Sequence, residues 1–226
     1  KTLLERIPAW NLETVLLTTR GRLTEASQTG IEALRMFGVS MPDPSDKAAL
    51  GQAIGAECGA VQRALAGRSI ESLEHLPRMT DPEKLALVGT FAGAIPPAYQ
   101  ANPELGTLMV LEAVQLPLEH GTAPVSPFSY ELYGIVHTIV TGDHEASYRF
   151  GLLGMRLSEL PEHQATRGAV HFIFGAFHSP WRRPLVESVE HFRKGARASF
   201  DAGDQLHGGY CMSFGSAHRL YAGEPI

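Results

Sequence analysis

The sequence predicts an all-α protein, a right-handed α-solenoid of stacked antiparallel helical hairpins with roughly ten helices. Apolar residues recur at helical spacing almost throughout, and no run alternates apolar and polar residues as a half-buried strand does. Similar turn sequences recur about every 40 residues, a length typical of one helical hairpin in such an array. The turns begin at Gly21, Gly67, Gly142 and Arg183, and each is followed by a glutamate that opens the next helix.

The N-terminal part predicts two helices separated by a break at residues 20–22. The second helix ends at Gly38, and Pro42 follows, because glycine favours a helix end and proline cannot continue one. The predicted apolar faces are Leu12, Val15, Leu16 and Thr19 in the first helix and Ala26, Ile31, Leu34 and Phe37 in the second.

A second hairpin is predicted from a longer helix over about 46–66 and a short helix over 70–76. The turn between them is Gly67-Arg68, and Pro77 stops the short helix. The residues of the longer helix predicted to point inward are Leu50, Ile54, Val61 and Leu65.

Further helices follow, and several begin with capping residues or proline. Thr80 is predicted to cap the first of them, with Pro82 in the first turn and Glu83 facing back to the cap. Gly121 and Gly203 are predicted C-terminal caps. The predicted helices span about 82–100, 103–120, 127–141, 143–160, 163–178, 183–202 and 204–222.

Composition excludes several classes of partner. The net charge is −5 at pH 7 and no block of basic residues is present, so nucleic acid is not an expected partner. Cys58 and Cys211 form no paired motif, which is typical of a reducing compartment and predicts a cytoplasmic protein. Residues 85–99 are the most apolar stretch, but it is shorter than a membrane span and contains Pro96-Pro97, so membrane insertion is not expected.

No sequence motif for catalysis, nucleotide binding or metal binding is present. The phosphate-binding glycine loops and the Gly-x-Ser-x-Gly elbow of hydrolases are absent. His163, His171 and His178 share a rough helix face but lie two turns apart, too far to hold one metal ion together. We therefore predict no catalytic residue, no cofactor and no metal site in this chain.

Aromatic residues in the C-terminal half are assigned mostly to interfaces between helices. Tyr133 with His137, and Phe174 with His178, fall on the first helices of their hairpins. In a solenoid these helices tend to line the concave surface. The four residues are therefore the predicted surface for a peptide or a small-molecule ligand.

Trp181-Arg182-Arg183-Pro184 has two interpretations. Trp181 and Arg182 can extend the binding surface as an exposed aromatic ring and a cation. Alternatively the four residues form a rigid turn with Trp181 packed inward, and this is the interpretation we favour.

Both ends of the chain suggest a segment cut from a longer array. The sequence begins Lys1-Thr2-Leu3, without a methionine. Residues 222–226, Ala-Gly-Glu-Pro-Ile, match the turn at Thr141-Gly142-Asp143, but no helix follows them. Such a cut is expected to leave apolar surface near Tyr210, Phe214 and Tyr221.

Several stretches carry a family resemblance: Met79-Thr80-Asp81-Pro82-Glu83-Lys84-Leu85-Ala86, Ile95-Pro96-Pro97-Ala98-Tyr99-Gln100-Ala101-Asn102-Pro103, Gly142-Asp143, Tyr148-Arg149-Phe150-Gly151, and Phe172-Ile173-Phe174-Gly175-Ala176-Phe177 leading to Trp181-Arg182-Arg183-Pro184-Leu185. With them, nearly the whole chain resembles the tetratricopeptide-like helical-repeat region of large bacterial signalling proteins. The expected subdivisions are N-terminal hairpins over about 1–77 and the best-matching repeats over about 78–226.

The resemblance implies a protein that joins a serine/threonine kinase-like domain, an AAA-type ATPase module, this array, a GAF sensor and often a histidine kinase. The kinase and ATPase motifs would lie outside these residues, and the shared motifs are structural, so no functional residue is carried over. The expected function is a non-catalytic scaffold or sensor segment that binds a partner protein or a neighbouring domain of the same protein. The alternatives are a small-molecule receptor using the concave face and an enzyme with an unrecognised site.

Overall fold

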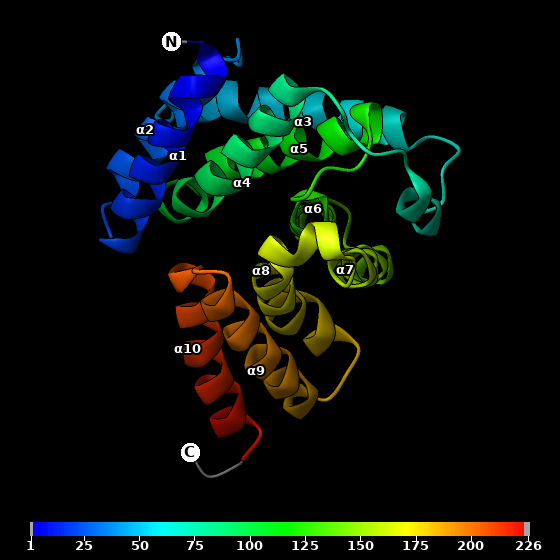
Figure 1. Ribbon diagram of the computed structural model, residues 1–226. Helices are drawn as coiled ribbons and strands as arrows, with labels where there is room; N and C mark the ends of the chain where they lie inside the picture. Colours follow the sequence, from blue (N-terminus) through cyan, green and yellow to red (C-terminus); the bar gives the residue numbers. More distant parts are fainter. Residues whose placement is uncertain (1, 224–226) are drawn as a thin grey trace. The chain divides into compact units, whose positions relative to one another are not determined.

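The computed structural model describes residues 2–223, which form ten α-helices and four shorter helical segments (Figure 1). No β-strand occurs within that range, where an isolated bridge joins Arg78 to Thr122, so the all-α prediction is confirmed. The predicted final turn residues 224–226 lie outside the described residues. The elements are α1 (Leu3–Thr19), α2 (Leu23–Arg35), α3 (Lys47–Leu65), η1 (Glu71–His75), α4 (Pro82–Ala101), α5 (Pro103–His120), α6 (Ser126–Thr141), α7 (His144–Ser158), η2 (Pro161–Thr166), α8 (Arg167–Ile173), η3 (Phe174–His178), η4 (Ser179–Trp181), α9 (Leu185–Asp201) and α10 (Gln205–Tyr221).

The chain divides into two compact units. The first unit contains the residues up to Arg68 together with His75–Ala123, and the second contains Ser69–Glu74 and the described residues from Pro124 onward. The subdivision expected near residue 77 does not coincide with this boundary. The reason is that α4 and α5 pack against α1, α2 and α3 and so belong to the first unit.

In the first unit, α1 packs on α2, α2 on α4, and α4 on α5. Gly30 permits the close crossing of α2 and α4, because a Cβ at that position would lie 2.7 Å from the Cβ of Ala94. Helix α3 packs on α5, where Gln115 donates a hydrogen bond to Glu57 at 2.6 Å. The first unit is therefore not a simple succession of neighbouring hairpins.

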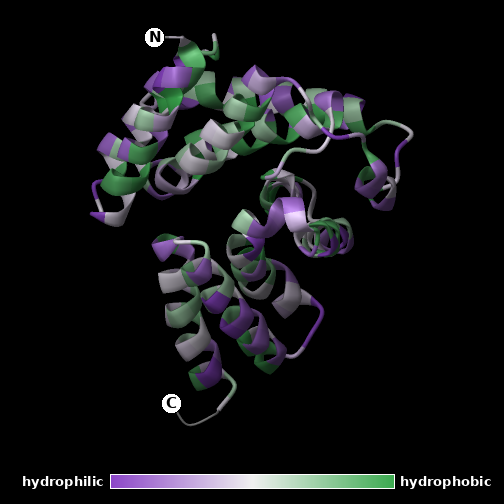
Figure 2. Cartoon of the chain, viewed as in Figure 1, coloured by the Kyte–Doolittle hydropathy of each residue, from purple (hydrophilic) through white to green (hydrophobic). Residues whose placement is uncertain are grey.

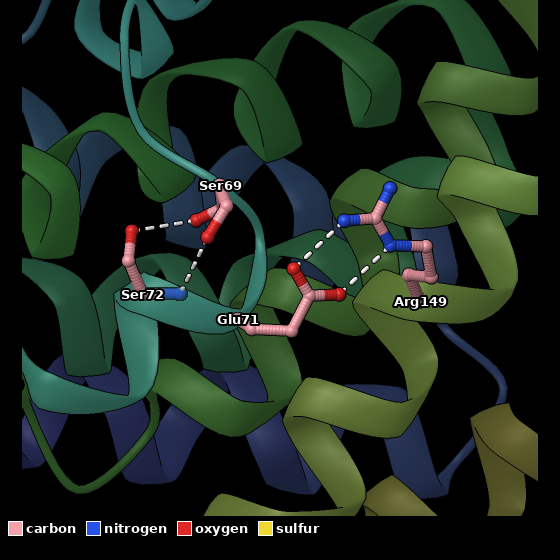
Figure 3. Close-up of polar contacts among 4 residues, drawn as sticks. All are labelled: Ser69, Glu71, Ser72 and Arg149. Carbon is pink, nitrogen blue, oxygen red and sulfur yellow. Dashed lines mark hydrogen bonds and ion pairs between the residues drawn. The ribbon is translucent and has the colours of Figure 1, made fainter.

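The short helix predicted at 70–76 is the 3-10 helix η1, and it belongs to the second unit rather than pairing with α3. Arg149 on α7 donates two hydrogen bonds to the Glu71 carboxylate, at 2.8 and 2.7 Å (Figure 3). Arg156 lies about two turns further along α7, and its Nε donates a hydrogen bond to the Glu74 carboxylate at 2.8 Å. The predicted hairpin is therefore wrong, because these ion pairs attach η1 to α7.

In the second unit, each helix from α6 to α10 packs on the next, and α6 also contacts α8, as α8 contacts α10. Gly168 brings α8 close to α9, because a Cβ there would lie 2.6 Å from the backbone nitrogen of Ser199. The single helix predicted over 163–178 is split into η2, α8 and η3. The last of these is π-helical, a distortion often found at functional positions.

Short polar side chains cap the start of several helices. The prediction for α4 is wrong by one residue, because Asp81 and not Thr80 accepts hydrogen bonds from the backbone N–H groups of Glu83 and Lys84, at 2.8 and 3.2 Å. Asp81 has the extended backbone that an N-cap needs, directly before Pro82. Equivalent caps are formed by Asp46, Asn102, Asp143 and Asp204.

Left-handed glycines end several helices. At Gly203 (φ 78°) the backbone N–H of Asp204 donates to the carbonyl of Ser199 at 2.8 Å, the bond that defines a Schellman C-cap. The predicted caps at Gly121 and Gly203 are confirmed, since both end helices with positive φ. Positive φ values also occur at Gly21 (72°), Gly38 (84°), Gly67 (74°), Gly142 (73°) and Gly223 (78°).

Gly203→Ala is expected to lower the free energy of unfolding by about 1–2 kcal/mol, because an L-residue is strained in the left-handed conformation. Gly209→Ala, in the body of α10, is the matched control: an added Cβ meets nothing within 4 Å there. It should raise stability by about 0.5–1 kcal/mol through helix propensity. Urea unfolding of both variants measures the difference, and effects of the same sign would contradict this account of the turn.

Helices such as α2 and α9 are amphipathic, and Figure 2 shows hydrophobic and hydrophilic residues interleaved along the helices. The predicted apolar face of α1 is an exception, because Leu12 and Val15 are 60% and 47% exposed. Helix α1 instead buries Ile7, Thr14 and Thr18. The largest fully buried side chains are Leu34, Leu50, Leu73, Phe91, Leu105, Leu108, Met109, Leu111, Tyr130, Leu153, Leu157 and Phe192.

Helix α10 carries exposed apolar residues, as expected from the sequence. Tyr221 is 77% exposed, and Met212 and Leu220 are also exposed. Tyr210 and Phe214 are partly covered, because both rings contact Phe172 of α8, with centroids 5.1 Å away in each case.

Candidate functional site

The predicted concave surface is largely buried. Tyr133 and Phe174 are each 4% exposed, His178 is 1% exposed, and His137 is half-buried. The Tyr133 ring packs edge-on against Phe150 on α7, with centroids 4.9 Å apart. These residues therefore belong to the core of the second unit and do not line an open surface.

Trp181 and Arg182 are exposed, so the favoured interpretation with Trp181 packed inward is wrong. Trp181 keeps 63% of its surface accessible and lies against the ring of His144, with centroids 4.3 Å apart. Arg182 forms an ion pair with Glu145. The partners of both residues lie in the first turn of α7, which holds them at the surface instead of in the core.

A buried hydrogen-bonded chain surrounds His178. Its Nε2 lies 3.1 Å from the backbone carbonyl oxygen of Glu131, and its Nδ1 lies 3.1 Å from Oγ of Ser147. Because a carbonyl oxygen only accepts, Nε2 must carry the hydrogen and Nδ1 must accept from the Ser147 hydroxyl. The contacts therefore select one neutral tautomer of His178.

A serine that donates to a histidine is also the arrangement of an activated nucleophile. Here Ser147 is 5% exposed and His178 is 1% exposed, and the second histidine nitrogen bonds a backbone carbonyl instead of a carboxylate. Burial lowers the pKa of His178 to about 4, with the Glu131 carbonyl opposing the shift. The imidazole is thus a weak base without contact to solvent, and the geometry supports a structural role.

The Glu131 carboxyl is the most unusual group in the core. Glu131 is fully buried, and neither of its carboxyl oxygens has a hydrogen-bond partner. Burial raises its pKa well above 4.5, and the nearby backbone amide of Phe174 opposes this rise only in part, without reaching hydrogen-bond geometry. The group therefore stays protonated to a higher pH than the carboxyl of an exposed glutamate does.

Glycines on α6 and α7 make the space for these polar side chains. A Cβ at Gly154 would lie 2.5 Å from Cγ of Glu131, and one at Gly151 would lie 2.8 Å from Cγ of His178. A Cβ at Gly134 would lie 2.9 Å from Cε1 of His178. Glu131 and Ser147 were not among the predicted site residues, and these mid-helix glycines are the signal in the sequence for a close contact there.

A groove with a volume of about 880 Å³ lies beside α9 in the second unit. None of the six residues predicted as a binding surface lines it. Its lining includes cationic side chains and the buried imidazole of His171, a residue weighed above only as a metal ligand. The lining residues are Glu159, Pro161, Glu162, Gln164, Ala165, Arg167, His171, Arg193, Lys194, Arg197, Ala198, Asp201 and Ala202.

The histidines and cysteines form no metal site in the described chain. Across residues 2–223, no three His, Cys, Asp or Glu side chains are grouped to hold a metal ion. Cys58 and Cys211 are free thiols, and burial, with the charge of Asp204, raises the pKa of Cys211 to about 12. That thiol stays protonated and unreactive at neutral pH.

Among the described helices, none combines the length and apolarity needed to cross a bilayer. No family model matches this chain, and neither a curated protein nor a solved structure is significantly similar to it. The succession of helices α6 to α10, the buried Glu131 and His178 side chains and the groove beside α9 are thus the features that bear on function.

Proposed function

We propose that this chain is a non-catalytic scaffold or sensor segment of a bacterial signal-transduction protein, built as a tetratricopeptide-like solenoid. Its partner would be a protein or a neighbouring domain, and the binding event would regulate kinase or ATPase modules outside these residues. The observation that carries the proposal is a set of contacts between alternate helices. Helix α6 contacts α8, and α8 contacts α10. Such contacts between alternate helices are expected where hairpins stack in an array.

The turns support the same proposal. Gly223 has the φ of 78° found at Gly203, and its N–H donates to the carbonyl of Leu220 at 3.1 Å. The N–H of Gly203 donates to Phe200 with the same geometry, also at 3.1 Å. A recurring turn is consistent with a regular repeat.

The exposed face of α10 is the proposed partner surface. Met212 and Leu220 lie eight residues apart, on the same side of the helix, and are 60% and 57% exposed. Tyr221, the residue after Leu220, is 77% exposed. Exposed apolar residues that cluster on one element are typical of a protein-binding surface.

Two alternatives have less support. A small-molecule receptor cannot use the face around Tyr133 and His178, since both residues are buried. An enzyme would need an accessible reactive group, whereas the Ser147–His178 pair is enclosed in the core. The two free cysteines are compatible with the proposed cytoplasmic location.

The test begins with the coding sequence on both sides of this segment. If it encodes ATPase or kinase modules, the double variant Met212→Ser/Leu220→Ser is made in the whole protein. We expect its ATP turnover or autophosphorylation to change at least threefold, because the regulatory contact is lost. Flanking sequence without any such module would overturn the signalling proposal.

The matched control is Gln205→Ala/Ser213→Ala, which alters two exposed polar residues of the same helix. It should leave the output of the whole protein unchanged. Circular dichroism should show equal helicity in both variants. An unchanged output in the Met212/Leu220 variant would remove α10 as the partner surface.

A further inference from the structure

The groove beside α9 has a charge pattern that the scaffold proposal does not use. Arg193, Lys194 and Arg197 extend from α9 into its lining, and Arg167 extends into it from the start of α8. All four side chains belong to the second unit, so one compact body forms the whole groove. Its volume of about 880 Å³ is within the usual range of small-molecule sites, about 300–1,000 Å³.

Arg167 is held in a fixed orientation. Its Nε donates to the carbonyl of Ser158 at 2.9 Å, and its Nη2 donates to the carbonyl of Glu159 at 3.0 Å. These carbonyls are at the C-terminal end of α7, where a cation is also favoured by the helix dipole. A guanidinium has five N–H donors, so donors are left over to face a ligand without any rearrangement of the side chain.

His171 provides a second preorganised donor. It is only 5% exposed and lines the groove, and its Nδ1 lies 3.3 Å from Nδ1 of His191. Within residues 2–223, its Nε2 has no hydrogen-bond partner. An anion at Nε2 would select the tautomer in which Nε2 carries the hydrogen and Nδ1 accepts from His191.

The surroundings of His171 are electropositive. Its pKa is lowered to about 4, first by burial and then by the charges of His191, Lys194 and Arg167, while Glu190 opposes the shift. Burial disfavours any charge, but the positive charges of Lys194 and Arg167, which contribute to this shift after burial, favour an anion at the same place. The groove therefore combines the buried imidazole of His171 with cationic side chains, and the carboxylates that pair with these cations are Glu159, Glu190 and Asp201.

An anionic ligand has to compete with nearby carboxylates for the cations of the groove. Glu190 accepts two hydrogen bonds from Arg193, at 2.8 and 2.7 Å, and lies 3.7 Å from Lys194. Glu159 and Asp201 are only loosely paired, 3.8 Å from Arg167 and 3.9 Å from Arg197. A monovalent anion would gain little over these carboxylates, so the ligand needs at least two negative charges.

We propose that this groove binds a small polyphosphate or a phosphorylated small molecule, with one phosphate group at Arg167 and His171 and another at the cations of α9. A phosphate group suits the site because its oxygens can accept from both walls at once, and arginine matches phosphate with paired hydrogen bonds. This site is independent of the α10 surface, so either proposal can fail without the other.

The test is isothermal titration calorimetry of the chain with tripolyphosphate, pyrophosphate and inorganic phosphate at constant ionic strength. We expect one saturable site, with affinity falling in that order. Lys194→Gln/Arg197→Gln should weaken tripolyphosphate binding at least tenfold, and His171→Gln should weaken it at least threefold. Both α9 side chains are more than half exposed, so this double variant is expected to fold normally.

The charge-matched control is Arg20→Gln/Arg35→Gln, which removes two exposed cations that do not line the groove. It should bind tripolyphosphate as the parent chain does. Equal weakening by the control would show non-specific attraction and overturn the proposal. So would the absence of saturable binding, or binding of a polyglutamate peptide without binding of tripolyphosphate.

Discussion

Phe192→Ala is expected to lower the free energy of unfolding by about 3–5 kcal/mol, the usual cost of removing a large buried ring. Phe192 is 1% exposed and lies where α8, α9 and α10 meet. Its ring centroid is 4.9 Å from that of His218, 6.1 Å from Phe214 and 6.4 Å from Phe172. Alanine would leave a cavity in contact with all three rings, and the surrounding helices cannot close it without losing their own contacts.

Phe200→Ala is the matched control, because Phe200 lies on the same helix but is 44% exposed. Its truncation should cost less than half as much. Urea unfolding followed by circular dichroism measures both losses, and amide hydrogen exchange should speed up in α9 and α10 of the Phe192 variant. Equal losses would show that Phe192 is not a central core residue.

Glu131→Met is expected to stabilise the chain, and the gain should grow with pH. Methionine has a similar length and lacks the carboxyl oxygens, which are buried without hydrogen-bond partners. Removing such a group favours the variant by about 1–3 kcal/mol. Most core substitutions lower the free energy of unfolding, so an increase would distinguish this effect from a general loss of packing.

The pH dependence follows from the direction of the pKa shift. Because the pKa of Glu131 is raised well above 4.5 in the folded chain, the unfolded chain releases its proton first as pH rises. The parent chain therefore loses stability from about pH 4.5 up to the folded pKa, and Glu131→Met does not. His178 is a separate case: its pKa of about 4 makes stability fall as pH drops from 6.5 towards 4 in both proteins.

Urea unfolding at pH 5 and pH 8 measures this effect. The stability difference between Glu131→Met and the parent chain should be larger at pH 8. Glu13→Met, at an exposed position of α1, is the control, because it makes the same substitution without removing a buried group. A gain that is equal at both pH values would show that the pKa of Glu131 is not raised in the folded chain.

Local features of the chain could be predicted from sequence because they depend on neighbouring residues. The expected helices over 82–100 and 103–120 closely match α4 and α5, since proline and asparagine mark their starts. The glycine turns at Gly121 and Gly203 were found for the same reason, because only glycine adopts positive φ without strain. The wrong cap at Thr80 is an error of one residue between two capping side chains.

The site could not be predicted in the same way. Periodicity shows that Tyr133 and His178 lie on apolar helix faces, but it does not show whether those faces meet another helix or solvent. The features that carry the site depend on residues far apart in the chain. They are the burial of the Glu131 carboxyl, the Arg149–Glu71 ion pair and the groove beside α9. The sequence by itself determined the all-α class, the helix ends and the glycine turns, because these depend on interactions within a few residues. Only the tertiary structure decided which faces are buried and which charges meet, because burial and pairing depend on what each helix packs against.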